Sequence, residues 1–234
     1  MAEATLTETI NNAIDSKLID THTALPAEVV SFNPTKQTVN LKIVVKRIKQ
    51  DGKTAVFPLL IDVPVCFMQT SNYSITFPIN AGDTGQVIFN ERQIDNWDIN
   101  GDILPPDDAR KHSLSDAVFF PQLTNQKNNI ASFNNNDLEI RTSDGATKIS
   151  ISTGGQITMD CTNLTINSEN TTVNASTKFK VDSPLSEFTG EVKVDGDVKA
   201  TGDVVADEGS TDISLTNHVH LGGTLAGGLT GAPQ

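Results

Sequence analysis

The sequence predicts an all-β fold in two styles: an N-terminal OB-like barrel preceded by a short helix, then an intertwined trimeric triple-stranded β-helix. Two observations support this fold class. Ten of the twelve aromatic residues lie before residue 135 and twelve of the sixteen glycines lie after it, so only the first part has the material for an ordinary packed core. The second part repeats short apolar-x-apolar units, whose alternation has the period of a β-strand.

Composition limits the classes of partner. The chain has 234 residues, a formal net charge of −12 and a pI near 4.6. Nucleic acids and anionic membranes attract basic proteins, so the acidic balance predicts no nucleic-acid partner and no adsorption to membranes by charge. Two widely spaced cysteines indicate no disulfide framework, and no apolar run approaches the ~20 residues of a transmembrane helix.

Residues 1–22 are predicted to form an N-terminal helical arm. Within residues 3–20, apolar side chains recur at helical spacing and mark one face of a single short helix. These side chains are Leu6, Ile10, Ala13, Ile14 and Leu18.

Residues 23–133 are predicted to form the OB-like barrel. Two β-rich runs flank the turn at Asn33-Pro34, and the runs FPLLIDVPVCFMQ and YSITFPINAGDTGQVIFNE follow, the latter with a turn at residues 81–83. About five strands within roughly 90 residues are typical of a small barrel that is closed or half closed. The acidic balance and the few aromatic residues argue against binding of single-stranded nucleic acid to this barrel.

Residues 134–208 are predicted to form the shaft. The repeat of six to eight residues is rich in Thr, Val, Ile, Asn, Ser, Asp and Gly, which favour strands and turns over the helices of a coiled coil. Its apolar-x-apolar pairs are Ile149/Ile151, Ile157/Met159, Leu164/Ile166, Phe179/Val181 and Val192/Val194. Because residues i and i+2 share a face, Cys161 is expected to face inward with Ile157 and Met159.

Strands this short cannot bury a face alone, and a single-chain β-helix needs coils of about 20 residues. Three chains winding around one axis solve the problem, because each chain supplies one strand to each face of a prism. The apolar pairs then meet at the centre and the strand edges pair between chains. The shaft therefore predicts a homotrimer.

Residues 209–234 are predicted to form a small metal-clamped apex. His218 and His220 are separated by one residue, so in a strand both point to the same side. Three chains would bring six imidazoles around one axial point, an octahedral donor set that suits Fe(II), Ni(II) or Co(II) better than zinc. Such a site has no open position for a substrate, so it would act as a clamp. The following glycines permit the tight chain reversal of a narrow tip.

Residues 78–97 and 107–123 resemble the N-terminal domain of the Gp138 family of phage membrane-puncturing spikes, and the terminal HVH, Gly-rich run and TGAPQ resemble the apex of such spikes. The resemblance implies a homotrimer at the tip of a tail baseplate in the virion, with no enzymatic activity. It implies that the barrel binds the tail hub, that His218 and His220 hold one iron ion per trimer, and that the needle contacts the host outer membrane only transiently. It leaves open whether the particle is a phage or a phage-derived contractile particle.

Two alternatives share parts of this pattern. A spike-associated cell-wall hydrolase would need an acid and a nucleophile in a cleft, but the acidic residues around Trp97 have the setting of loops and turns. These residues are Asp95, Asp98, Asp102, Asp107 and Asp108. A trimeric receptor-binding fibre would usually end in a larger head with exposed aromatic residues. The remaining histidines, His22 and His112, are expected to be solvated in polar loops.

Overall fold

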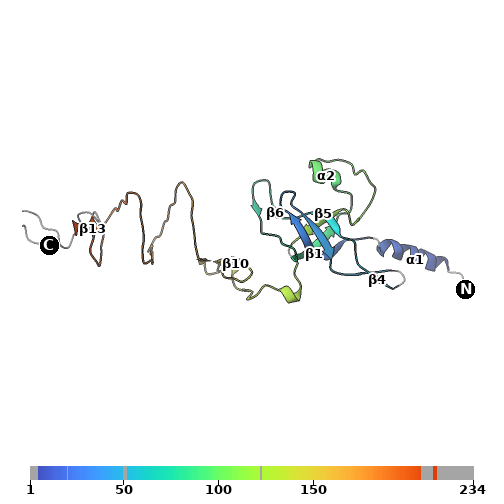
Figure 1. Cartoon of the computed structure of the whole chain (residues 1–234), viewed down its shortest axis with the longest axis horizontal. Helices are drawn as coiled ribbons and strands as arrows, with labels where there is room; N and C mark the ends of the chain where they lie inside the picture. The colour runs from blue at the N-terminus through green and yellow to red at the C-terminus, as the bar shows by residue number, and fades with distance from the viewer. Residues whose placement is uncertain (1–4, 20, 50–51, 122, 207–212, 215–234) are drawn as a thin grey trace, which may run out of the picture. The chain divides into compact units, whose positions relative to one another are not determined.

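The structure, a computed structural model, describes residues 5–19, 21–49, 52–121, 123–206 and 213–214 (Figure 1). The chain divides into two compact units, Met1–Thr165 and Ile166–Gln234. The described residues are mostly β-structure with a short N-terminal helix. In these ranges, no helix combines the length and the apolar character that a bilayer crossing requires.

The N-terminal helix α1 (Leu6–Ile19) confirms the helix expected from the apolar spacing. It begins at a capping box, because the Thr5 backbone N–H donates to Glu8 Oε2 at 2.7 Å and the Glu8 N–H donates to Thr5 Oγ1 at 3.3 Å. The Thr5 N–H and then the Thr5 hydroxyl, which both donate to the Glu8 carboxylate, lower the pKa of the Glu8 carboxyl. The helix has no buried residue.

Five strands form a curled half-barrel in the order β5-β2-β1-β8-β9. Their bounds are Leu60–Pro64 (β5), Thr38–Ile43 (β2), Ala24–Asn33 (β1), Thr84–Phe89 (β8) and Ala117–Phe120 (β9). All four neighbouring pairs are antiparallel. At one end the sheet curls far enough for Val65 to form a parallel bridge with Phe119, and the Cys66 N–H donates to the Phe119 carbonyl at 2.8 Å. The expected partly open barrel is thus confirmed.

The core of the half-barrel is one cluster of side chains that alternate along its strands. The buried hydrophobic residues are Ala27, Val29, Val39, Leu41, Ile43, Leu60, Val63, Ile79, Val87, Phe89, Ala117 and Phe119. Gly85 lies directly under this core: a Cβ there would stand 2.4 Å from the Phe120 carbonyl oxygen and 2.5 Å from the Phe119 ring. Only glycine fits at that position.

The expected turns lie where the sequence places them. The Asn33 side chain accepts the N–H groups of Thr35 and Lys36 at the β1–β2 hairpin. Before β8, Gly82 has a φ of 94°, in the left-handed region that glycine adopts without strain. The Asn80 N–H donates to the Asp83 carboxylate there at 2.7 Å.

Smaller elements extend from the half-barrel. Two short hairpins pair β3 (Arg47–Ile48) with β4 (Thr54–Ala55) and β6 (Met68–Gln69) with β7 (Ser74–Ile75). The helix α2 (Asp95–Asn100) follows β8 and ends at Gly101, and the 3₁₀ turn η1 (Gln126–Asn128) follows β9.

A second sheet contains β10 (Leu138–Arg141), β11 (Lys148–Ile151) and β12 (Ile157–Asp160), all antiparallel. The start of the expected shaft therefore pairs within the chain, where we expected pairing between chains. The reason lies in the turns: Gly145 and Gly155 have φ values of 74° and 82°, which allow two tight reversals. Farther along, β13 (Val205–Ala206) pairs with β14 (Ile213–Ser214).

Candidate assembly surface

One face of the β10–β12 sheet is entirely apolar and uncovered. The register aligns Leu138, Ile151 and Ile157 in one row and Ile140, Ile149 and Met159 in the next. All six are exposed in the single chain. We call these six side chains the apolar face. A three-stranded sheet needs such a face to be buried for its stability, so this sheet requires a cover.

The opposite face of the same sheet is charged and internally paired. Glu139 accepts from Arg141 at 3.2 Å, and Lys148 lies 3.7 Å from Glu139 and 3.8 Å from Asp160. Hydrogen bonds from Asn134 and then Arg141 hold the pKa of the Glu139 carboxyl below its ordinary value. The charged side chains of this face pair with one another, so this face is suited to contact with water, whereas the apolar face is a candidate contact surface.

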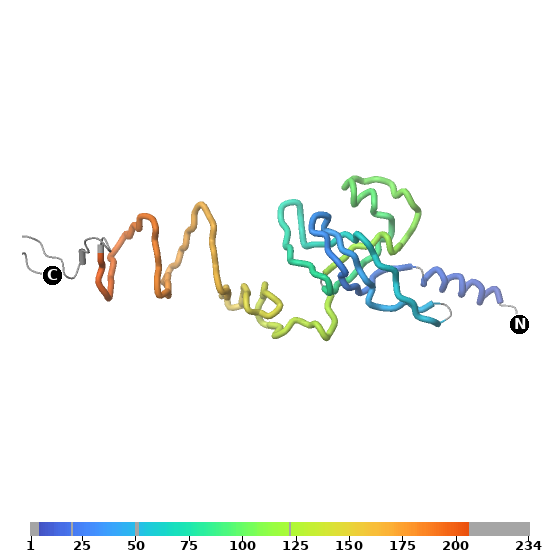
Figure 2. The backbone as a smooth tube through the Cα atoms, in the orientation of Figure 1, coloured from blue at the N-terminus to red at the C-terminus, as the bar shows by residue number. Residues whose placement is uncertain are grey.

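Residues 161–204 form a long extended segment with no strand pairing. Within residues 161–202 no backbone N–H or C=O bonds to the backbone of another described residue. Every residue from 159 to 205 is exposed, and the expected pairs Leu164/Ile166, Phe179/Val181 and Val192/Val194 are among them. Figure 2 shows residues 166–200 as successive straight runs that reverse direction, coloured yellow to orange.

Within the described residues, this extended segment lacks the two features that normally stabilise a fold, namely backbone pairing and buried apolar side chains. Unpaired backbone groups along a strand are a template for pairing with another chain, and exposed alternating apolar side chains add to the need for a partner. Polar side-chain bonds occur along the segment, such as Ser168 with Thr171, but they are local and exposed. The segment is therefore a candidate assembly surface. The apolar face and the extended segment together are the candidate functional site.

The predicted metal ligands His218 and His220 lie outside the described residues. Among the residues that are described, no group of three or more His, Cys, Asp or Glu side chains gathers as a metal site. Cys161 is exposed in the single chain and lines a hollow with Leu164 and with Met159, one of the two side chains with which we expected it to face inward.

Sequence reasoning missed a buried ion pair in the loop between β8 and β9. Asp116 is fully buried, and Arg110 donates to it through Nε at 2.7 Å and Nη2 at 2.8 Å. Arg110 also donates to Asp95 at 2.9 Å. Hydrogen bonds from Gln93 and then Arg110 lower the pKa of the Asp95 carboxyl, and the two carboxylates raise the pKa of Arg110. The only sequence signal is an arginine six residues before an aspartate that opens a strand.

The acidic residues near Trp97 have a structural use. Asp95 and Asp98 lie in α2 rather than in a loop, which corrects our expectation for these two. Asp108 remains in a loop, where its N–H bonds to Gln93 at 2.8 Å and its carboxylate lies 3.9 Å from Arg110. The cluster thus fastens α2 to the half-barrel.

The expectation of two solvated histidines was wrong. His22 is half-buried, with ring centroids 5.6 Å from Phe57 and 5.7 Å from Phe89. His112 is also half-buried, and its Nδ1 atom is buried without a hydrogen-bond partner. Both lie near the entrance to β1, since the His22 N–H donates to the His112 carbonyl at 3.4 Å.

The half-barrel carries the family relationship. Residues 25–122, which contain its five strands apart from the first residue of β1, match the family model described as the phage protein Gp138 N-terminal domain. This segment is similar to the Gp138 N-terminal domain. The match confirms the resemblance inferred for the N-terminal domain, does not extend to the apex, and indicates a phage structural protein of the tail or spike, a virion component. It is consistent with a role that is not enzymatic. A comparison with curated proteins gave no match.

Proposed function

We propose that this chain is the homotrimeric central baseplate spike of a contractile phage tail, or of a phage-derived particle, and that it pierces the host outer membrane during sheath contraction. The Gp138 domain would attach the trimer to the tail hub. The observation that carries the proposal is the extended segment: more than forty consecutive residues are exposed, without backbone partners, and bear alternating apolar pairs.

Three chains together would supply the missing backbone partners and cover the exposed apolar side chains. Winding around one axis turns each unpaired strand edge toward a neighbouring chain and each apolar pair toward the centre. The apolar face of the β10–β12 sheet would form one side of a three-sided prism, with its charged face outward. Intertwined strands can be separated only by breaking many bonds at once. A shaft of this kind resists bending and unfolding when the sheath drives it forward.

The apex is proposed to hold one metal ion per trimer through His218 and His220. Six imidazole nitrogens from three chains are a donor set that suits a first-row transition metal, and the family resemblance favours iron. Bound there, the ion would supply a crosslink between the three chain ends. The histidines would thereby hold the tip closed, because the tip could open only if a metal–imidazole bond broke.

Mass in solution combined with elemental analysis tests this function. We expect a trimer with one metal ion per three chains. His218→Ala should abolish metal binding while the shaft stays trimeric, whereas His112→Ala, outside the apex, should leave the metal content unchanged. A stable monomer would overturn the spike. A trimer whose metal content is unchanged by His218→Ala would overturn the metal site alone.

A membrane assay separates piercing from receptor binding. We expect the isolated trimer to bind intact cells weakly, because a spike passes through the membrane under force and does not adhere to it. Strong saturable binding to intact cells would instead support a receptor-binding fibre.

A further inference from the structure

The hairpin β3–β4 and its flanks carry an unusual concentration of positive charge for this acidic chain. Lys46, Arg47 and Lys49 are exposed, and none of them lies within ion-pair distance of a carboxylate in the described residues. Ile48 is 66% exposed between them, and Val44 is exposed beside them. We call residues 44–49 the basic hairpin arm. Among the described residues, its exposed apolar side chains are uncovered and its positive groups have no carboxylate partner.

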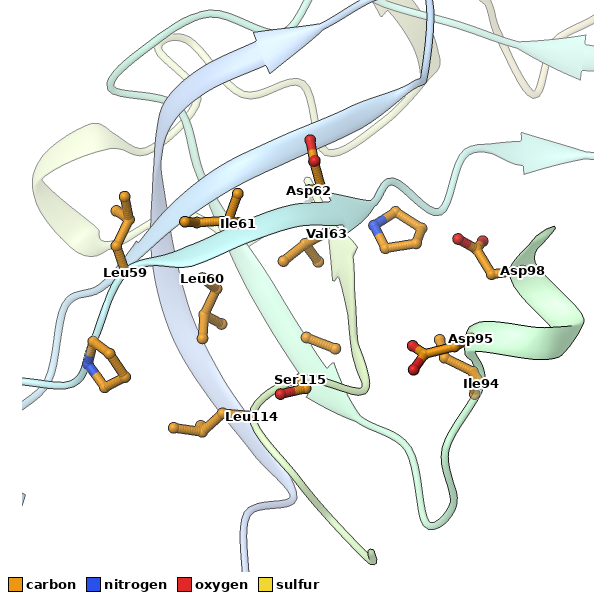
Figure 3. Close-up of a pocket in the computed structure, with 13 residues that line it drawn as sticks. Leu59, Leu60, Ile61, Asp62, Val63, Ile94, Asp95, Asp98, Leu114 and Ser115 are labelled. Carbon is orange, nitrogen blue, oxygen red and sulfur yellow. The ribbon is translucent and has the colours of Figure 1, made fainter. Parts of the chain in front are cut away.

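A cavity of opposite character lies at the open side of the half-barrel. It is lined by β5, by the start of α2 and by the loop that enters β9. Figure 3 shows Asp95 and Asp98 extending from α2 on the side that faces β5. Leu59 and Ile61, both exposed, supply apolar surface along β5. We call this the acidic cavity.

Carboxylates outnumber cations around the acidic cavity. Among the described residues the only cation paired with Asp62 is the exposed Lys36, at 3.5 Å, and the Thr38 hydroxyl also donates to this carboxylate at 3.3 Å. Arg110 is shared among Asp95, Asp108 and Asp116. Asp98 has no ion pair within the described residues. The cavity therefore presents a net negative charge to an incoming group.

A cyclic trimer needs two different surfaces on each chain. Away from the threefold axis, where identical residues meet, contacts are head-to-tail, so a patch of one kind meets a complementary patch of another kind on the next copy. The basic hairpin arm and the acidic cavity form such a pair, with opposite charge and apolar residues on both sides. In Figure 1 β4 and α2 extend from the half-barrel in different directions.

We propose that the basic hairpin arm of one protomer docks into the acidic cavity of the next, so that three half-barrels close a ring. This inference rests on the proposed trimer and adds which surfaces join its barrel domains. The shaft already holds the chains together, so docking proceeds at the high effective concentration of a tethered pair. A contact smaller than a free-standing interface is therefore sufficient. Complementary charge fixes its register.

Crosslinking between differently tagged chains tests the ring. In a background of Cys66→Ser and Cys161→Ser, one chain carries Ile48→Cys and a co-expressed chain carries Ile61→Cys. The matched control replaces Ile61→Cys by Tyr73→Cys, a site in the β6–β7 hairpin that is more exposed, at 81% against 68% for Ile61. We expect a disulfide between the two tagged chains that forms at least about tenfold faster than in the control, because docking orients the pair.

Charge reversal shows whether the stated surfaces are responsible. Arg47→Glu with Lys49→Glu should slow the crosslink by about tenfold, and Asp98→Lys in the partner chain should restore it. The mass of each sample is measured in parallel. A trimer that crosslinks equally at Ile61 and Tyr73, or not at all, overturns the ring and leaves the spike intact. A trimer that crosslinks as expected but is insensitive to charge also overturns it. A monomer overturns the proposed function itself.

Discussion

The apolar face of the β10–β12 sheet gives the sharpest test of assembly. Ile140 lies in the edge strand β10, opposite Ile149 of the central strand β11, and is 66% exposed in the single chain. Ile140→Ser removes most of its apolar surface without disturbing the backbone of the strand. If the face is covered by the other two chains, the variant should weaken the trimer.

The size of the effect follows from the exposed fraction. Complete burial of an isoleucine side chain contributes about 1.5–3 kcal/mol. Burial of the exposed two thirds of Ile140 therefore contributes about 1–2 kcal/mol per chain, or about 3–6 kcal/mol per trimer. Since about 1.4 kcal/mol corresponds to a factor of ten, the association constant of the trimer should fall by roughly two to four orders of magnitude.

The assay is the mass of the protein as a function of its concentration, measured by sedimentation velocity, together with its thermal unfolding. Ile99→Ser in α2 is the matched control, because Ile99 is 79% exposed but lies outside the apolar face. We expect dissociation at low concentration for Ile140→Ser and unchanged behaviour for Ile99→Ser. If the two variants behave alike, the apolar face meets only solvent and the reasoning is refuted.

Three further predictions concern the half-barrel. Arg110→Met should lower the free energy of unfolding of the half-barrel by about 3–5 kcal/mol in urea titrations, because buried Asp116 loses its partner. The control Arg92→Met, at an exposed site, should change the same free energy by less than about 0.5 kcal/mol. Gly85→Ala should cost about 1–3 kcal/mol by steric overlap in the same measurement, whereas Gly190→Ala, with no atom within 4 Å, should be neutral. The pKa of Asp95 in the folded protein lies below its unfolded value. Its contribution to stability is therefore complete above the unfolded pKa and is lost as the pH falls through the folded pKa. Asp95→Asn should flatten the acid limb of unfolding followed by circular dichroism.

The half-barrel could be predicted because its signals are local. Turns at Asn33-Pro34 and Gly82 separate runs whose alternation fixes which side chains enter the core. The burial of Asp116 could not be predicted, because an aspartate at the start of a strand normally faces water. Its burial depends on Arg110, and a pairing between two loop positions leaves no periodic trace in the sequence.

The composition of the predicted shaft indicated strands and turns, but the pairing between those strands was predicted only in part. Its first three strands pair within the chain because the glycine turns at 145 and 155 close two hairpins. Apolar-x-apolar spacing fixes which side chains share a face, and the aligned rows of β11 and β12 confirm this for Ile149/Ile151 and Ile157/Met159. Spacing alone contains no information about which edge a strand pairs with, so it could not distinguish a hairpin from an intertwined shaft.

The positions of the buried residues distinguish the part of the chain that has its own core from the part that lacks one. All twelve buried hydrophobic side chains of the described residues lie between Ala27 and Phe119, and none lies in the second sheet or the extended segment. The half-barrel can thus fold as a single chain, whereas in the proposed trimer the shaft would gain its core only when other chains arrive. The same contacts that complete the fold of the shaft would then determine its stiffness. On this proposal, a substitution that weakens the trimer would also weaken the needle, while a substitution in the half-barrel core need not.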